Sequence, residues 1–267
     1  MILLKTGDGS QAVLHLQGGH LTAWRTATGR EPLFLSPLAV FRPGIPIRGG
    51  IPIIFPQFAD LGKLPKHGFA RTAPWTLSRQ AEGATTSSLT VRMETESTTY
   101  PDWPYCASLE LAIRLGGEAL RLNLTVTNQD VRPFSFTAAL HTYLRVSDTR
   151  KVQIHGLTAH HYRDATQAGR LAHDAAPWLD VAAEVDRTYL EVRRAVELHE
   201  PSACLTVRQE GFRDLVVWNP GSEKASALGD LGAEHSQQMV CLEAAAVGEP
   251  ILLPPGARWH GAQILIA

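Results

Sequence analysis

The sequence lacks the features that mark membrane, secreted and nucleic-acid-binding proteins. No apolar run is long enough to cross a bilayer, and the N-terminal MILLKTGDG has no extended apolar core of the kind found in secretory signals. The 25 lysines and arginines nearly balance the 26 aspartates and glutamates, and no basic face or polybasic tail stands out. We therefore expect a cytoplasmic protein, a monomer or weak homodimer, with neither a membrane nor a nucleic acid as partner.

Cysteine is scarce, and motifs that hold metals or cofactors are missing. Cys106, Cys204 and Cys241 are odd in number, widely spaced and each in a strand-like context, which predicts buried free thiols in a reducing compartment. A cupin-type metal enzyme would show His-x-His with a further carboxylate and histidine nearby, and no such group is visible. No glycine-rich dinucleotide fingerprint is present either. We expect no metal and no cofactor.

Helical periodicity is weak, and alternation of apolar and polar residues dominates. The runs 108–115 and 120–127 alternate on either side of Gly116-Gly117, which predicts an antiparallel hairpin. Shorter alternating runs predict strands at 89–93, 152–154 and 205–208. Two short helices are predicted, one over 222–228 with Ser222 as N-cap and one near 182–185. Because no linker or repeat interrupts the chain, we predict an all-β fold in which residues 1–267 form one large antiparallel β-sandwich with a few short helices.

Residues 47–71, IRGGIPIIFPQFADLGKLPKHGFAR, form the most informative segment. Arg48 is followed by two glycines, and His67-Gly68 precedes Phe69-Ala70-Arg71. Glycine beside arginine lets a ligand approach the backbone while the guanidinium binds an anion, and histidine adds a group that titrates near neutrality. The segment therefore predicts one wall of an active site that binds an anion and handles protons.

Two ionisable residues lie within apolar strands. His141 lies in AALHTYL and Glu243 in VCLEAAA. A carboxylate in such a run must be paired or used, and desolvation raises its pKa toward the range of a base that works at neutral pH. Taken alone, a strand histidine is more often a hydrogen-bonded structural residue and a strand glutamate more often faces solvent.

Six motifs in order support the catalytic interpretation. IRGGIP, PKHGFAR, LHTYLRVSD, Asp186-Arg187-Thr188-Tyr189, VVWNP and CLEAAAV resemble the aldose 1-epimerase (mutarotase) superfamily, and more narrowly its hexose-6-phosphate mutarotase branch, the glucose-6-phosphate 1-epimerases. The resemblance runs from about Arg48 to the end of the chain. It implies a galactose mutarotase-like supersandwich and a metal-free acid/base reaction that interconverts the anomers of a hexose 6-phosphate.

The resemblance also implies roles for individual residues. His141 matches the general acid and Glu243 the general base of the family. His67 matches a second histidine near the sugar ring oxygen, and Asp186 matches an aspartate that binds sugar hydroxyls. Arg48 and Arg71 match the arginines at the phosphate end.

Three further residues carry open alternatives. Gln57 follows the Arg-Gly-Gly run and could bind a hydroxyl or the phosphate. Trp218 could line the rim of the sugar site or simply pack. Lys66 departs from the usual neutral residue before the histidine, and it could add to phosphate binding or be a solvated loop lysine.

The chemistry of mutarotation agrees with these residues. A proton leaves the C1 hydroxyl and another reaches the ring oxygen, so one carboxylate and one imidazole suffice. Two other functions remain open. A mutarotase of free aldoses would not need two arginine clamps, and a non-catalytic sugar-phosphate-binding module would not need both proton-transfer groups.

Overall fold

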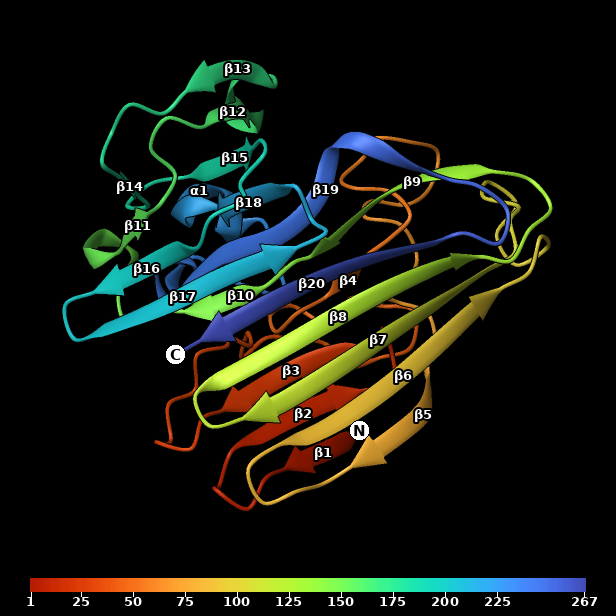
Figure 1. Cartoon of the computed structure of the whole chain (residues 1–267). Helices are drawn as coiled ribbons and strands as arrows, with labels where there is room; N and C mark the ends of the chain where they lie inside the picture. The colour runs from red at the N-terminus through yellow and green to blue at the C-terminus, as the bar shows by residue number, and fades with distance from the viewer.

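Two large antiparallel sheets lie face to face in a computed structural model that describes residues 1–267, and a smaller sheet near the N-terminus lies beside them (Figure 1). This nearly all-β architecture confirms the predicted fold class. No helix is both long and apolar enough to cross a membrane.

The larger sheet has nine strands. Its order is β14 (Trp178–Asp180), β11 (Gln153–His155), β16 (Val196–Glu200), β17 (Ala203–Glu210), β20 (Arg258–Ile266), β8 (Ala119–Asn128), β7 (Ala107–Gly116), β6 (Ser87–Thr95) and β5 (Thr76–Ala81). The predicted hairpin is confirmed as β7 and β8, with Leu111 opposite Leu124. The turn reaches a φ of +57° at Gly117, a conformation that glycine adopts without strain. The strands predicted at 89–93, 152–154 and 205–208 are β6, β11 and β17.

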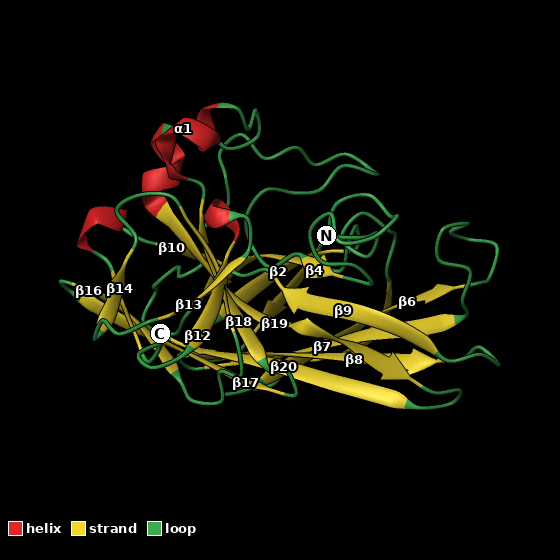
Figure 2. Ribbon diagram, turned by 90° about the horizontal axis from the view of Figure 1, so that it is seen from above, coloured by secondary structure: helices red, strands yellow, loops and turns green.

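The second sheet has eight strands and covers the first. Its order is β13 (Arg170–His173), β12 (His161–Asp164), β15 (Val185–Tyr189), β18 (Asp214–Asn219), β19 (Met239–Leu253), β9 (Phe134–Leu140) and β4 (Ile53–Ile54), with β10 (Tyr143–Arg145) also paired to β19. Figure 2 shows this sheet above the nine-stranded sheet, with α1 and long loops on its outer side. The eight-stranded sheet therefore has one face toward the core and one face toward these loops.

The remaining elements are short. β1 (Ile2–Lys5), β2 (Gln11–His15) and β3 (His20–Arg25) form the three-stranded sheet, α1 spans Gly221–Ser226, and single 3₁₀ turns are η1 (Thr149–Lys151), η2 (Ala165–Gln167) and η3 (Glu234–Gln238). The helix predicted at 222–228 exists, but its N-cap is Pro220 and not Ser222. The helix predicted near 182–185 is wrong. The chain bends there and enters β15 at Val185, because pairing with β18 outweighs a weak local preference.

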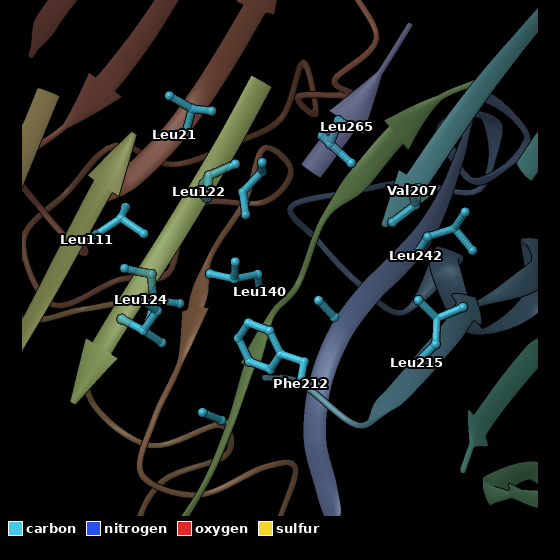
Figure 3. Close-up of a cluster of buried hydrophobic side chains, with 14 of the residues drawn as sticks. Leu21, Leu111, Leu122, Leu124, Leu140, Val207, Phe212, Leu215, Leu242 and Leu265 are labelled. Carbon is cyan, nitrogen blue, oxygen red and sulfur yellow. The ribbon is translucent and has the colours of Figure 1, made fainter. Parts of the chain in front are cut away.

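Leucine-rich strands build the core between the sheets. A cluster of 54 buried residues includes Leu111, Leu122 and Leu124 from one sheet and Leu140 and Leu242 from the other (Figure 3). These side chains come from every second position of their strands, so burying them fixes which residues of the eight-stranded sheet face outward.

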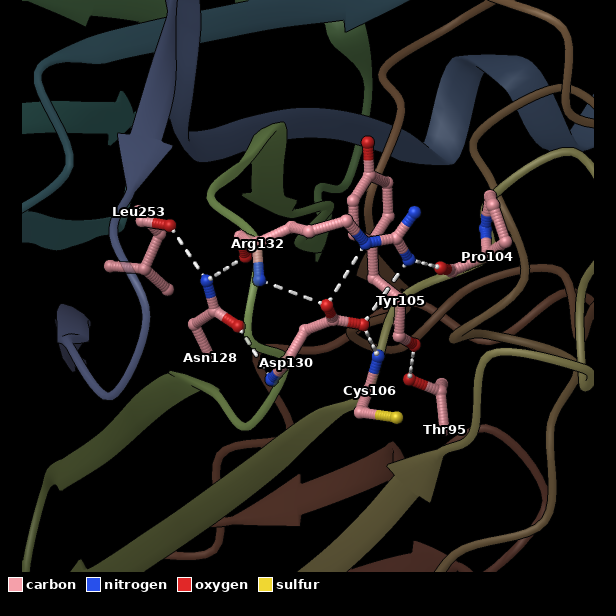
Figure 4. Close-up of polar contacts among 8 residues, drawn as sticks. All are labelled: Thr95, Pro104, Tyr105, Cys106, Asn128, Asp130, Arg132 and Leu253. Carbon is pink, nitrogen blue, oxygen red and sulfur yellow. Dashed lines mark hydrogen bonds and ion pairs between the residues drawn. The ribbon is translucent and has the colours of Figure 1, made fainter.

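A polar network holds the loop between β8 and β9, where the chain passes from one sheet to the other (Figure 4). Asp130 Oδ1 accepts hydrogen bonds from the backbone N–H and Nε of Arg132, and its Oδ2 accepts one from the Cys106 N–H. Asn128 Nδ2 donates to the carbonyl oxygens of Arg132 and Leu253, at 2.9 and 2.8 Å. The network ties the start of β9 to β7 and β19, and β9 leads directly to His141.

The thiols are free, but only one of them is fully buried. Cys241 is buried in β19, Cys106 is partly buried and Cys204 is exposed on β17. The prediction of three buried thiols is therefore wrong for Cys106 and Cys204. An alternating strand has an outer face, and a cysteine on that face has a strand-like sequence context without burial.

Candidate active site

Alternation along β19 places Glu243 on the outer face of the eight-stranded sheet. Val240, Leu242 and Ala244 belong to the core between the sheets. Cys241 and Glu243 therefore point the other way, toward the loops, as successive strand residues must. Both faces of β19 are buried here, because loop and helix residues cover the outer side. A strand buried on both faces has a continuous apolar run, which is why Glu243 looks out of place in the sequence.

His141 lies where the strand next to β19 is interrupted. β9 ends at Leu140 and β10 begins at Tyr143. The backbone N–H groups of His141 and Tyr143 donate to the carbonyl oxygens of Pro52 and Gly50, at 3.0 and 2.9 Å. His141 Nε2 lies 3.3 Å from Glu243 Oε1, and the two side chains are 9% and 1% exposed. The structure thus brings the two proposed proton-transfer residues into direct contact.

Burial shifts the pKa values of the pair in opposite directions. It lowers the pKa of His141 well below its usual range, and His67, Arg71 and Arg48 lower it further. It raises the pKa of Glu243 well above its usual range, and the carboxylate of Asp186 adds to this shift. Both shifts favour a pair that holds a single proton near neutral pH. Moving this proton across the 3.3 Å contact converts the neutral pair into an imidazolium and a carboxylate.

His67 faces His141 across the site. Its φ of +66° is in the left-handed region, which is costly for a histidine and typical of functional loops. The rings of His67 and His141 are 5.6 Å apart and nearly perpendicular. Burial lowers the pKa of His67 to about 3, and Arg71, Lys66 and Arg48 contribute. Since its Nδ1 accepts a 3.2 Å hydrogen bond from the Ala59 N–H, neutral His67 carries its proton on Nε2 and can donate it to a ligand oxygen.

The guanidinium groups of Arg48 and Arg71 differ in how many contacts they make with other side chains. Arg48 Nη2 contacts Asp230 Oδ1 at 3.1 Å, and its Nη1 donates to the Tyr143 hydroxyl at 3.0 Å. Arg71 Nη2 donates to the Lys66 carbonyl oxygen at 2.7 Å. The Nε of each arginine is buried without a partner. Arg71 is therefore the freer cation, whereas Arg48 is fixed by Asp230 and Tyr143.

One row of paired residues crosses the sheet beside the His141–Glu243 pair. Asp186 of β15 is opposite Trp218 of β18, which is opposite Cys241 of β19, which is opposite Tyr143 of β10. Residues directly opposite in an antiparallel sheet share a face, so these side chains form a floor next to Glu243. Burial raises the pKa of Asp186. The Trp218 ring is nearly perpendicular to those of His141 and Tyr143, at 5.8 and 6.0 Å, so it both packs and borders the site.

The side chain of Gln57 is hydrogen-bonded to the backbone of the loop before His67, and the side chain of Lys66 is exposed on that loop. Gln57 Nε2 donates to the carbonyl oxygens of Ala59 and Leu64, and its Oε1 accepts from the Leu64 N–H. These backbone bonds use the amide that we expected to bind a hydroxyl or phosphate. The Lys66 side chain is 60% exposed and lies 3.8 Å from Asp60.

Tyr143 and Asp230 belong to the site although the sequence interpretation did not include them. The Tyr143 ring stacks on His141 with centroids 4.8 Å apart and planes 10° apart. Its place two residues after His141 in the motif LHTYLRVSD was the available signal. Asp230 lies in a loop far along the chain from Arg48, and nothing local to its sequence indicates the contact.

Unpartnered buried polar atoms mark where a ligand would bind. His141 Nδ1, Glu243 Oε2 and the Nε atoms of Arg48 and Arg71 are buried without hydrogen-bond partners. Native proteins leave few such atoms, because each costs about 1–3 kcal/mol. Four of the ten such atoms in the molecule belong to these residues, and a polar ligand bound beside them would satisfy them.

A separate cavity lies elsewhere in the molecule. It measures about 850 Å³, lies beside the bulge of β19, and contains none of the residues above. Among its charged lining residues, Arg193 contacts Glu191 at 2.7 Å and Asp214 accepts a hydrogen bond from the Gly248 N–H at 2.7 Å. The His141–Glu243 pair therefore lies on the outer face of the sheet and not in this cavity.

Known proteins resemble this chain over nearly its whole length. The family model described as aldose 1-epimerase matches residues 1–265. A Cenchrus ciliaris protein named "Putative glucose-6-phosphate 1-epimerase" is 36% identical over 97% of this chain and 82% of its own length. A protein of the same name from Escherichia coli K12 is 31% identical over 90% of this chain and 81% of its own length.

Solved structures share the fold. The crystal structure of a "putative mutarotase" from Salmonella typhimurium superposes with a TM-score of 0.89 at 27% identity, and covers 96% of this chain and 86% of its own. A structure from Synechocystis, at 20% identity, has a TM-score of 0.84 and covers 99% and 94% of the two chains. The family match, the relatives and the shared fold agree that this chain belongs to the aldose 1-epimerase family and is an isomerase of the epimerase type.

Proposed function

We propose that this protein interconverts the α and β anomers of a hexose 6-phosphate, with glucose 6-phosphate as the first substrate to test. The observation that carries the proposal is the buried His141–Glu243 contact of 3.3 Å, with Arg48 and Arg71 close enough to shift the pKa of His141. The names of the relatives support the same substrate. The three free thiols and a phosphorylated substrate favour a cytoplasmic location.

The pair provides both proton transfers of mutarotation. The Glu243 carboxylate takes the proton of the C1 hydroxyl, and the His141 imidazolium gives a proton to the ring oxygen as the C1–O5 bond breaks. Rotation about C1–C2 exposes the other face of the aldehyde. In ring closure the O5 hydroxyl adds to C1 and returns its proton to His141, while the new C1 alkoxide takes a proton from Glu243. Each group ends as it began.

Neighbouring residues position the sugar in this scheme. The Nε2–H of His67 donates to an oxygen near the ring, and Asp186 accepts from a sugar hydroxyl. Stacking on Tyr143 holds the His141 ring in place, and Arg48 fixes the Tyr143 hydroxyl. Arg71 offers its free N–H groups to the phosphate, since only its Nη2 is bonded, to a backbone oxygen.

Arg71→Ala tests the phosphate assignment. A charge-assisted contact contributes about 1.5–3 kcal/mol, so kcat/KM for glucose 6-phosphate should fall about 10- to 100-fold. Free glucose never makes the contact, and its kcat/KM should change little. Arg79→Ala, which removes an exposed arginine of β5, is the matched control. Exchange between anomers is measured by saturation-transfer NMR, with the spontaneous rate subtracted.

Arg48→Ala should also lower kcat/KM more for glucose 6-phosphate than for glucose, but with a smaller difference between the two substrates. Its loss also leaves Asp230 unpaired and removes the donor to Tyr143, so activity toward both sugars should fall. Equal losses on glucose and glucose 6-phosphate in Arg71→Ala would contradict the phosphate role and favour a mutarotase of free aldoses. Binding of glucose 6-phosphate without any catalysed exchange would favour the non-catalytic module.

A further inference from the structure

We propose that the floor of this site also binds a thiophilic divalent cation of the Zn²⁺ type, held by His141, Glu243 and Cys241, and that the bound cation inhibits the enzyme. The inhibition rests on the proposed function, whereas the binding does not. Cys241 has no part in the proton transfers, yet its thiol lies among the groups that carry them out.

Three different ligand types converge at this point. One donor atom each from His141, Cys241 and Glu243 lies within 4.8 Å of the other two, and all three residues are buried. Cys241 and Glu243 are two residues apart on β19 and so share its outer face, while His141 approaches from the interruption between β9 and β10. Two of the three donors thus lie on a paired strand, and the backbone N–H of His141 is held by the Pro52 carbonyl oxygen.

The donors suit zinc in kind and number. Zn²⁺ binds imidazole nitrogen, carboxylate oxygen and thiolate sulfur at about 2.0–2.3 Å, and sites with three protein ligands keep a fourth position for water or a ligand oxygen. Glu243 Oε2 and His141 Nδ1 have no hydrogen-bond partner, although both are buried. A cation among the three donors would satisfy a carboxylate that now has only the imidazole beside it.

The same donors discriminate against other cations. Mg²⁺ prefers six oxygen ligands in octahedral geometry and should not bind, whereas Co²⁺ accepts the same ligands as Zn²⁺. Binding requires the Cys241 thiol to lose its proton, and the Glu243 carboxyl too when it is protonated, with both protons going to the buffer. A cation held there occupies the lone pairs that the proton transfers need, so inhibition follows directly.

A second group of donors provides the internal control. Glu197, His199 and Cys204 also place donor atoms within 4.8 Å of one another, on the surface of the nine-stranded sheet. His199 Nε2 is 2.8 Å from Glu197 Oε2. A metal bound at this surface group would not touch the catalytic pair. Cys204→Ser removes its thiol, so this variant is the background in which the buried group is tested.

The experiment compares Cys204→Ser with Cys204→Ser/Cys241→Ser, and with Cys204→Ser/Cys241→Ala in case serine at the buried position impairs folding. Co²⁺ is added, and the near-ultraviolet thiolate-to-cobalt charge-transfer band is recorded. We expect the band in Cys204→Ser and its loss in both double variants. A missing band in Cys204→Ser, or an unchanged band after the loss of Cys241, would overturn the site.

Inhibition is measured on the same proteins with glucose 6-phosphate. Zn²⁺ should inhibit Cys204→Ser, EDTA should restore its activity, and Mg²⁺ should have no effect. Loss of a residue that only orients a metal ligand costs about 10- to 100-fold in affinity, so loss of Cys241 should raise the half-inhibitory Zn²⁺ concentration at least about 10-fold. Equal inhibition with and without Cys241 would overturn the inhibitory role. A cobalt band in a protein that catalyses no anomer exchange would refute the proposed function and leave the metal site standing.

Discussion

Burial of His141 and Glu243 determines how many protons the pair holds at a given pH. The pKa of His141 is lowered and that of Glu243 is raised, and both shifts favour the pair that holds one proton. The sequence indicated both residues, because ionisable groups in apolar strands are unusual. It could not indicate their 3.3 Å contact, which depends on the register between β19 and the chain after β9.

The pH dependence of kcat/KM follows from this pair. Double protonation requires a pH below the ordinary histidine pKa of about 6.5, and loss of the last proton requires a pH well above the ordinary glutamate value of about 4.3. We therefore expect kcat/KM to fall on the acid side at a pH below the ordinary histidine value of about 6.5, and on the basic side at a pH above the ordinary glutamate value. The phosphate of the substrate also titrates, and its ionisation is followed separately by ³¹P NMR. An acid limb centred above pH 6.5 would show that burial does not keep His141 neutral.

Among the strands and loops, the segment from Gln57 to His67 shows why some residues could not be assigned from sequence. Gln57 was expected at the ligand, but its amide holds the backbone at Ala59 and Leu64. Polar side chains satisfy loop backbones as readily as ligands, and sequence alone does not distinguish the two. The strands were easier to predict, since apolar and polar residues that alternate over ten positions, as in β7 and β8, match the period of a strand and not that of a helix.

Gln57→Ala should loosen the loop that carries His67. Three hydrogen bonds to backbone are lost, so we expect faster hydrogen exchange at the Leu64 amide and a kcat/KM for glucose 6-phosphate lower by about 10-fold. Gln80→Ala, at an exposed position of β5, is the control and should leave both unchanged. If exchange at Leu64 and activity both match the wild type, the loop does not depend on Gln57.

At the scale of the whole molecule, the sequence predicted a β-sandwich but not the order of the strands in its two sheets. The alternating runs indicated a β-sandwich, and the order of strands in each sheet depends on long-range pairing that no local pattern encodes. His20 is an example, because its sequence context gave no role. It is completely buried, and its Nε2 lies 2.7 Å from the Gly49 carbonyl oxygen, next to the glycines that follow Arg48.

Acid should destabilise the fold through His20. Burial lowers its pKa from 6.5 to about 4, so the unfolded chain binds this proton at a higher pH than the folded chain does. The contribution to stability is complete above pH 6.5 and is lost as the pH falls toward 4, about 3 kcal/mol in total. Between pH 7 and pH 4, the free energy of unfolding measured in urea should therefore fall more for the wild type than for His20→Gln. The difference between the two falls should be about 3 kcal/mol. Equal losses in the two proteins would contradict this assignment.

The central claim is that His141 and Glu243 carry the protons of mutarotation on a phosphosugar. Saturation-transfer NMR of glucose 6-phosphate measures the exchange of anomers directly, in the wild type, in Glu243→Gln and in His141→Asn. Each substitution keeps the approximate shape and removes one proton-transfer group. We predict that kcat falls about 100-fold or more in each variant, while binding changes modestly. Exchange near the wild-type rate in either variant would contradict the role given to that residue.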